Sequence, residues 1–445
     1  MTRRIKKHKG SWPLPVLFLL PFTLSCFSPQ TEPVITTLKE NAGWCWFQDE
    51  RAVIRDGILV FGSVADASGL DGEQRDGNVE VTAFDLRGKK PLGIAILHER
   101  LEGDDHNVPA LLFLRDGRLL AVYSKHNTDT SIRCRITEQP NDYLRWSPEK
   151  IIDRDARVTY ANVFFLQQEN AGQGRIYDFY RGENWNPNYI FSDDDGQTWT
   201  YGGRLITFDG RPYVRYASNG RNRIHFITTE HHPRSFDNSL YHAYVEDGSL
   251  FRSDGTLIKS LAAGPMSPSD GTRIFAGDSS QVAWGIDIHL DSEEKPFAAY
   301  SVQIDDDSTK LVYRYARWDG EAWNDHFLAH AGTALYGRER DYTGLVALDP
   351  ESPDIVYISA DADPVTGAPL ISKKDNQPHY EVFKGITDSQ GKEWRWTALT
   401  SDSDSDNLRP IVPISDADEK VLLWLRGTYS SYTDYDLDAV GMILH

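Results

Sequence analysis

The chain has few cysteines and is short of positive charge. Only 3 of its 445 residues are cysteine, and Cys45 and Cys134 are the two outside the first 26 residues. They allow at most one intramolecular disulfide and exclude a cysteine-based metal cluster. The 47 Lys and Arg residues face 66 Asp and Glu residues, which leaves a net charge of −19. A chain this acidic lacks the basic surface that nucleic acids require, so no nucleic-acid partner is expected.

Amphipathic helical stretches are also missing, and no apolar run beyond the N-terminal segment is long enough to span a membrane. Aromatic residues are abundant instead, with 12 Trp and 21 Tyr, and such residues favour strands. Short apolar strands alternate with tight turns of the hairpin-forming type. These turns are Asp116-Gly117, Asp195-Gly196, Asn219-Gly220, Asp247-Gly248 and Asp319-Gly320. The chain is therefore predicted to be all-β.

The N-terminal segment has the pattern of an export signal. Five basic residues between Arg3 and Lys9 precede an apolar stretch around Val16 to Leu20, and Ser25-Cys26 follows. Residues 1–26 are predicted to be a lipoprotein-type signal peptide with Cys26 as the lipidation site, and simple cleavage near this point is the alternative. The protein is then periplasmic, at the outer membrane or cell surface, or secreted, and meets a membrane only through the lipid anchor. Removal of residues 1–25 takes the net charge to about −24.

One segment indicates how the strands are organised. Ser192-Asp-Asp194-Asp-Gly196-Gln-Thr198-Trp199 matches the Asp-box pattern of sialidase-type propeller blades, and a weaker copy spans Ser389 to Trp394. Radial repetition of four-stranded blades suits a chain of this length. The prediction is a short linker at 27–40 and one seven-bladed β-propeller at 41–445. A strand at 439–444 should close the ring with a strand near the start of the mature chain.

Candidate chemical groups concentrate at strand ends in the middle of the chain. His106 and His126 stand before and after one predicted hairpin, so both can return to the same rim. Tyr and Arg residues follow in the next segments, but no Ser-His-Asp order and no clear carboxylate pair accompanies them. This composition favours proton abstraction beside a carboxylate over acyl transfer or ordinary glycoside hydrolysis.

The chemistry of a uronic acid explains that preference. Removal of its C5 proton builds up negative charge unless a cation neutralises the carboxylate first, and Arg does so through two parallel hydrogen bonds. Tyr or neutral His can take the proton, and Tyr or protonated His can supply one to the leaving oxygen. This chemistry requires no cofactor, and the sequence leaves a bound metal unknown. His231 and His232, with His242 or Glu230, are an alternative metal-binding group, and a purely structural role is open for each single His or Tyr.

Distinctive motifs occur along nearly the whole mature chain: Gly43 to Ala52, Asp105 to Ala110, Tyr123 to His126, Asn186 to Tyr189, Tyr241 to Tyr244, Ala283 to Asp287, Asp341 to Gly344, Asp406 to Pro410 and Leu423 to Gly427. As a set they resemble those of the BNR-repeat-containing propeller family, which includes the seven-bladed ulvan lyases. The resemblance implies a lyase that cleaves a uronic-acid-containing, ulvan-like polysaccharide by β-elimination. The acidic polysaccharide is the expected partner, and the protein is expected to be a monomer.

The resemblance also implies a catalytic group of two histidines about twenty residues apart, a Tyr, and an Arg some fifteen residues later. His106 and His126 match the histidine spacing, and Tyr189 with Arg204 is the matching second pair. Arg215 is the alternative to Arg204. Further substrate contacts are expected from Asn107, Arg215, Tyr241 and Tyr244.

Two other functions remain open. A related propeller family hydrolyses rhamnose linked to glucuronate with a first-blade histidine, but Gln48 stands in the comparable stretch here. A surface lipoprotein that binds glycan without cleaving it is the other alternative, and the presence of both His106 and His126 argues against it.

Overall fold

The computed structural model describes residues 1, 34–46, 48, 51–415 and 419–444. Contacts divide the chain into residues 1–33 and 34–445, and the second unit carries the fold described below. The predicted signal peptide, including Cys26, lies outside the described residues apart from Met1. Within them, no helix is both long and apolar enough to cross a bilayer.

Seven antiparallel sheets follow one another along the chain, each forming one blade. The first three blades have four strands each. These are β2 (Ala52–Arg55), β3 (Ile58–Val64), β4 (Val79–Asp85) and β5 (Lys90–His98); β6 (Ala110–Phe113), β7 (Leu119–Ser124), β8 (Ser131–Ile136) and β9 (Lys150–Asp153); and β10 (Thr159–Leu166), β11 (Arg175–Arg181), β12 (Pro187–Ser192) and β13 (Thr200–Arg204).

The fourth blade has six strands and the last three have four each. These are β14 (Val214–Ser218), β15 (Arg223–Thr228), β16 (Leu240–Glu246), β17 (Ser249–Phe251), β18 (Leu257–Ser260) and β19 (Thr272–Phe275); β20 (Gln281–Leu290), β21 (Pro296–Ile304), β22 (Leu311–Trp318) and β23 (Trp323–Gly332); β24 (Val346–Asp349), β25 (Ser352–Ala360), β26 (Glu381–Ile386) and β27 (Arg395–Ala398); and β28 (Asp406–Ile411), β29 (Lys420–Ser431), β30 (Asp434–Leu444) and β1 (Ile35–Lys39).

In the part of the chain that the structure describes, helices are limited to single turns in the loops between strands, as the sequence pattern predicts. They are α1 (Gly72–Arg75), η1 (Asp105–Asn107), η2 (Asn170–Gly172), η3 (Glu183–Trp185), η4 (Pro233–Ser235), η5 (Leu261–Ala263) and η6 (Pro268–Asp270). Two of them, η1 and η3, carry residues of the sites described below.

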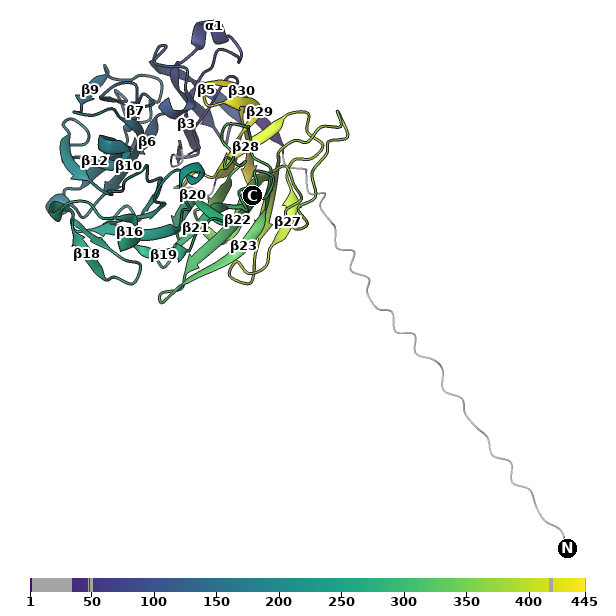
Figure 1. The fold of residues 1–445 in the computed structure, drawn as a ribbon. Coiled ribbons are helices and arrows are strands. Elements are labelled where there is room, and N and C mark those ends of the chain that lie inside the picture. Colours follow the sequence, from purple (N-terminus) through teal and green to yellow (C-terminus); the bar gives the residue numbers. More distant parts are fainter. Residues whose placement is uncertain (2–33, 47, 49–50, 416–418, 445) are drawn as a thin grey trace. The chain divides into compact units, whose positions relative to one another are not determined.

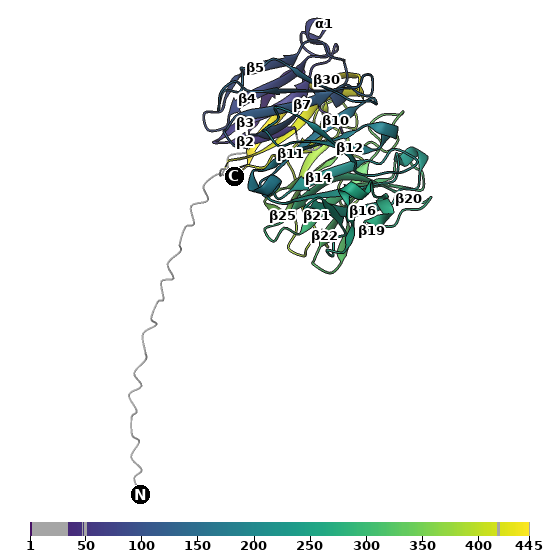
Figure 2. The same ribbon diagram turned by 90° about the vertical axis from the view of Figure 1, so that its left-hand side faces the viewer.

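The sheets stand side by side in a ring, because the first strand of a blade contacts the first strand of the next from β2 through β6, β10, β14, β20 and β24 to β28. Colours in Figure 1 run round the ring from purple to yellow, and Figure 2 shows the same blades after a quarter turn. The ring closes where β1 pairs with β30, with Ile35 opposite Met442. The all-β, seven-bladed propeller and its closure by the two ends of the chain are therefore confirmed. Because β1 spans residues 35–39, the propeller takes up part of the segment predicted as a linker.

The Asp box forms the turn between β12 and β13. Its Asp194 carboxylate accepts hydrogen bonds from the Thr198 amide at 2.8 Å and the Thr198 hydroxyl at 2.6 Å, and the Gly196 amide donates to the Ser192 hydroxyl. Gly196 has a φ of 79°, which glycine adopts without steric cost. In the weaker copy between β26 and β27, the hydroxyl of Ser389 accepts from the Glu393 amide and so replaces the missing carboxylate. Both turns are structural.

Candidate active site

His106 and His126 lie together at one end of the second blade. His106 is in η1, just before β6, and His126 follows β7, so the hairpin returns both to the same rim. Their rings stack with centroids 3.7 Å apart and planes 9° apart. The carboxylate of Asp104 bridges the pair, with one oxygen 2.7 Å from Nδ1 of His106 and the other 2.8 Å from Nδ1 of His126. Because Asp104 occupies Nδ1 of each ring, proton exchange with a substrate would use Nε2.

The two histidines differ in their affinity for a proton. Burial lowers the pKa of His106, but Cys45 and Asp104 raise it, and the net pKa is well above the usual value. Burial lowers the pKa of His126, and the positive charge of His106 lowers it further. His106 is therefore the protonated member of the pair and His126 the neutral one at neutral pH. Neighbouring groups whose pKa values are pushed apart in this way are suited to proton transfer.

Blade 3 supplies a tyrosine beside the histidines. The ring of Tyr160, on β10, stacks near His106 with centroids 5.6 Å apart. Tyr160 has a φ of 69° and lies where the register between β10 and β11 shifts between Thr159 and Asn162. A left-handed conformation is unfavourable for a bulky residue, and bulges of this kind re-aim side chains next to active sites. Burial raises the pKa of Tyr160, so the phenol stays protonated.

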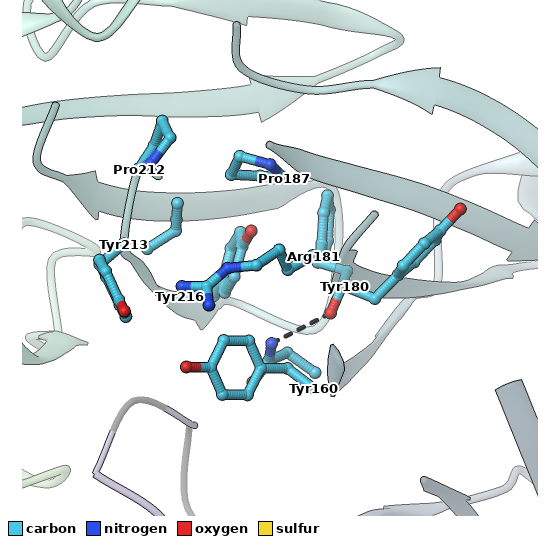
Figure 3. Close-up of a pocket in the computed structure, with 10 residues that line it drawn as sticks. Tyr160, Tyr180, Arg181, Pro187, Pro212, Tyr213 and Tyr216 are labelled. Carbon is cyan, nitrogen blue, oxygen red and sulfur yellow. Dashed lines mark hydrogen bonds between the residues drawn. The ribbon is translucent and has the colours of Figure 1, made fainter. Parts of the chain in front are cut away.

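Arg181, which has no acidic partner among the described residues, completes the group. Arg181 ends β11, and its guanidinium carbon lies 4.8 Å from the ring centre of Tyr160 and 4.4 Å from that of Tyr213 (Figure 3). Its side chain is buried, and among the described residues no carboxylate pairs with it and its Nη2 has no hydrogen-bond partner. Because a buried cation without a counter-ion is costly, this position is suited to an anionic ligand.

Blade 7 contacts the histidine pair through Tyr432 and contacts η1 through Arg409 and Tyr429. The ring of Tyr432, in the turn between β29 and β30, lies edge-on to both histidine rings at 5.2 and 5.4 Å. The Asp105 carboxylate accepts from Arg409 at 2.8 Å and from the Tyr429 hydroxyl at 3.0 Å. This buried ion pair joins η1 to blade 7, so contacts with blade 7 hold His106 in position.

The other residues of the predicted catalytic group lie elsewhere in the structure. The ring of Tyr189, on β12, lies beside those of Tyr177 and Phe179, with ring centroids 6.1 and 6.0 Å apart. It is buried in the core between blades 3 and 4. Arg204 forms an ion pair with Glu183 at 2.9 Å. The rings that contact His106 and His126 are those of Tyr160 and Tyr432 instead. Side chains alternate between the faces of a strand, and on β12 this turns Tyr189 into the packing between blades.

The predicted substrate contacts have structural partners. Arg215 donates from Nη1 to the carbonyl oxygens of Trp46 and Gln48, and the amide of Asn107 donates to the carbonyl of Glu102 at 3.0 Å. The Tyr241 hydroxyl donates to Glu230 at 2.9 Å, and Tyr244 stacks on His225 at 5.0 Å. Sequence reasoning did not select Tyr160, Arg181 or Tyr432.

Among the residues that the structure describes, two groups of three potential metal ligands share His106: Cys45 with Asp105, and Asp104 with His126. Asp104 already holds both histidine Nδ1 atoms, and Asp105 is held by Arg409, so the contacts between protein groups explain their positions. Cys45 and Cys134 are both free and buried.

Comparisons with known proteins agree with this architecture. The model of a BNR repeat-containing family matches residues 72–331. Two structures of an ulvan lyase from polysaccharide lyase family PL25, one bound to -[GlcA(1-4)Rha3S]-, align with TM-scores of 0.67 and 0.66, at 14% and 13% identity, over 91% of this chain and 94% of theirs. The polysaccharide lyase Uly1 aligns with a TM-score of 0.56 at 11% identity, over 89% and 90% of the two chains. No curated protein matches the sequence. The chain belongs to the BNR repeat-containing family.

Proposed function

We propose that the protein is a polysaccharide lyase that cleaves a uronic-acid-containing, ulvan-like polysaccharide by β-elimination. The observation that carries the proposal is the position of Arg181, a buried arginine without an acidic partner among the described residues. Its guanidinium contacts the ring of Tyr160, which in turn contacts His106. A uronate carboxylate is the counter-ion that such a position fits. The lyase structures with the same fold support this function.

Each step of the reaction can be assigned to a residue of this group. Arg181 binds the uronate carboxylate and stabilises the charge that builds up on it. Neutral His126 takes the C5 proton through Nε2, the electron pair forms the C4–C5 double bond, and the bond from C4 to the glycosidic oxygen breaks. Tyr160 donates its proton to the leaving oxygen. His106 and Asp104 are positioning residues: the positive charge of His106 helps to keep His126 neutral, and the Asp104 carboxylate holds the His126 ring in place.

The decisive experiment incubates the purified protein with a panel of uronate polysaccharides and follows the absorbance of the unsaturated uronate. The same digest is analysed by mass spectrometry, because lysis and hydrolysis products differ by one water. Unsaturated ends that disappear in His126→Ala support the lyase. A saturated sugar as the only product would instead identify a hydrolase, and tight binding without any product would identify a glycan-binding protein.

The site of action follows from the substrate. An enzyme that cleaves a polysaccharide meets this substrate outside the cytoplasm, in agreement with the predicted export signal and lipidation of Cys26. Detergent partitioning of the wild type and Cys26→Ser tests the anchor, because only the lipidated protein should enter the detergent phase. Equal partitioning of both proteins would mean that no lipid is attached.

A further inference from the structure

Arg181 lines a small pocket together with Tyr160 and Tyr213, called the Arg181 pocket here. A larger cavity opens beside it. It lies between the loops of blades 3 and 4, has a volume of about 980 Å³, and is called the Trp185 cleft here. Trp185, Arg204, Phe208, Arg211 and His231 are among the residues that line it. Its volume is at the upper end of those of small-ligand sites. None of the proposed proton-transfer residues lines it.

Trp185 is held in this cleft by a strained backbone. Asn184 and Trp185 have consecutive φ angles of 55° and 63°, a conformation that bulky residues rarely adopt. The indole is nevertheless 40% exposed, so its burial in the core does not compensate for the strain. Strain that persists without such compensation is typical of functional positions. An exposed indole offers a flat apolar face on which a sugar ring can stack.

The cleft also holds positive charge, in contrast to the acidic chain as a whole. The guanidinium carbon of Arg211 lies 5.5 Å from the Trp185 ring centre, and Arg211 has no ion pair among the described residues. Arg204 pairs with Glu183, which is 56% exposed, and exposed ion pairs of this kind contribute little free energy. Asp209 is the acidic residue of the lining and Glu183 pairs with Arg204, so Arg211 is the arginine that an anion in the cleft can meet without displacing Glu183.

The Trp185 cleft shares a wall with the Arg181 pocket. Arg211 lines the cleft, whereas the next two residues, Pro212 and Tyr213, line the pocket (Figure 3). In the same way, Asn186 lines the cleft and Pro187, the next residue, lines the pocket. The cleft is therefore a neighbouring position into which a chain bound at Arg181 can continue.

We propose that the Trp185 cleft binds an anionic sugar residue adjacent to the uronate at the cleavage point, with its ring on Trp185 and its sulfate or carboxylate on Arg211 and Arg204. This proposal rests on the proposed function, because the cleavage point is defined by Arg181. It makes the cleft a determinant of substrate specificity that is separate from the proton-transfer residues.

The test compares steady-state kinetics of Trp185→Ala and Arg211→Ala on ulvan and on chemically desulfated ulvan. Phe327→Ala and Arg395→Ala, which remove exposed side chains from blades 5 and 6, are the matched controls. Loss of a stacking or charge-assisted contact should raise KM about tenfold with kcat nearly unchanged, and the controls should match the wild type. If desulfation abolishes the effect of Arg211→Ala, the bound group is sulfate. If the effect persists, it is a carboxylate.

The two proposals fail in different ways. Unchanged KM values for both variants on both polymers would exclude the cleft as a subsite while lyase activity stands. If the wild type forms no unsaturated product, calorimetric titration with ulvan oligosaccharides decides the matter: weaker binding by Arg211→Ala keeps the subsite, and equal or absent binding excludes it. Thermal unfolding checks each variant, and Arg211→Ala carries the test alone if Trp185→Ala does not fold.

Discussion

Blade 3 contains two tyrosine–arginine pairs that differ in their surroundings. Tyr160 and Arg181, on β10 and β11, lie beside the histidine pair, and the arginine has no acidic partner among the described residues. Tyr189 and Arg204, on β12 and β13, lie further out in the blade, where the tyrosine is packed in the core and the arginine pairs with Glu183. Both pairs consist of a tyrosine followed by an arginine on the next strand. The strand on which a pair stands therefore decides whether it lies beside the histidine pair.

Replacement of the two arginines should separate the pairs most clearly. Arg181→Ala removes the group that neutralises the uronate carboxylate in the transition state, so kcat/KM should fall by about 10²- to 10³-fold. Arg204→Ala should leave kcat close to that of the wild type and raise KM only. Release of unsaturated uronate gives both parameters. A larger loss of kcat in Arg204→Ala than in Arg181→Ala would reverse the assignment.

Removal of the two phenol groups makes the same comparison for proton transfer. Tyr160→Phe keeps the ring beside His106 but loses the proton donor, so turnover should fall by at least about 10²-fold. Tyr189→Phe keeps the ring in the core between blades and should retain nearly full turnover. Thermal unfolding of both variants is the control, since each retains its aromatic ring. Loss of activity in Tyr189→Phe alone would show that the outer pair performs the chemistry.

Removal of the aromatic ring of Tyr189 should affect the stability of the fold instead of the reaction. Tyr189→Ala leaves a cavity among Tyr177 and Phe179, and the free energy of unfolding should fall by about 3–5 kcal/mol. A Cβ at Gly202 would lie 1.9 Å from the Tyr189 ring, which shows how tightly the ring is packed. Urea denaturation measures the change, with Tyr189→Phe as control. Unchanged stability would mean that the ring is not part of the core.

The sequence was sufficient for the parts of the molecule that depend on local patterns. The Asp box, the hairpin turns and the position of His106 and His126 around one hairpin follow from neighbouring residues, and the structure shows the fold that they predict. Tyr160 could not be selected in this way, because its direction depends on a bulge that only the pairing of β10 with β11 reveals. The isolated charge of Arg181 depends on which residues the ring brings near it, and no local pattern contains that information.

The smallest effect concerns how the histidine pair controls the protonation of the base. In the wild type, burial and the positive charge of His106 hold the pKa of His126 below its usual value, so the base stays deprotonated into mildly acidic solution. His106→Gln keeps a polar side chain beside Asp104 but removes the charge, and the pKa of His126 should therefore rise. Because the base acts only when deprotonated, the acid limb of the kcat/KM profile should move to higher pH. Tyr432→Phe, which keeps its ring against both histidines, should leave the limb where it is. An unmoved limb in His106→Gln would mean that His126 is not the base, and Tyr160 or another group would then have to take the C5 proton.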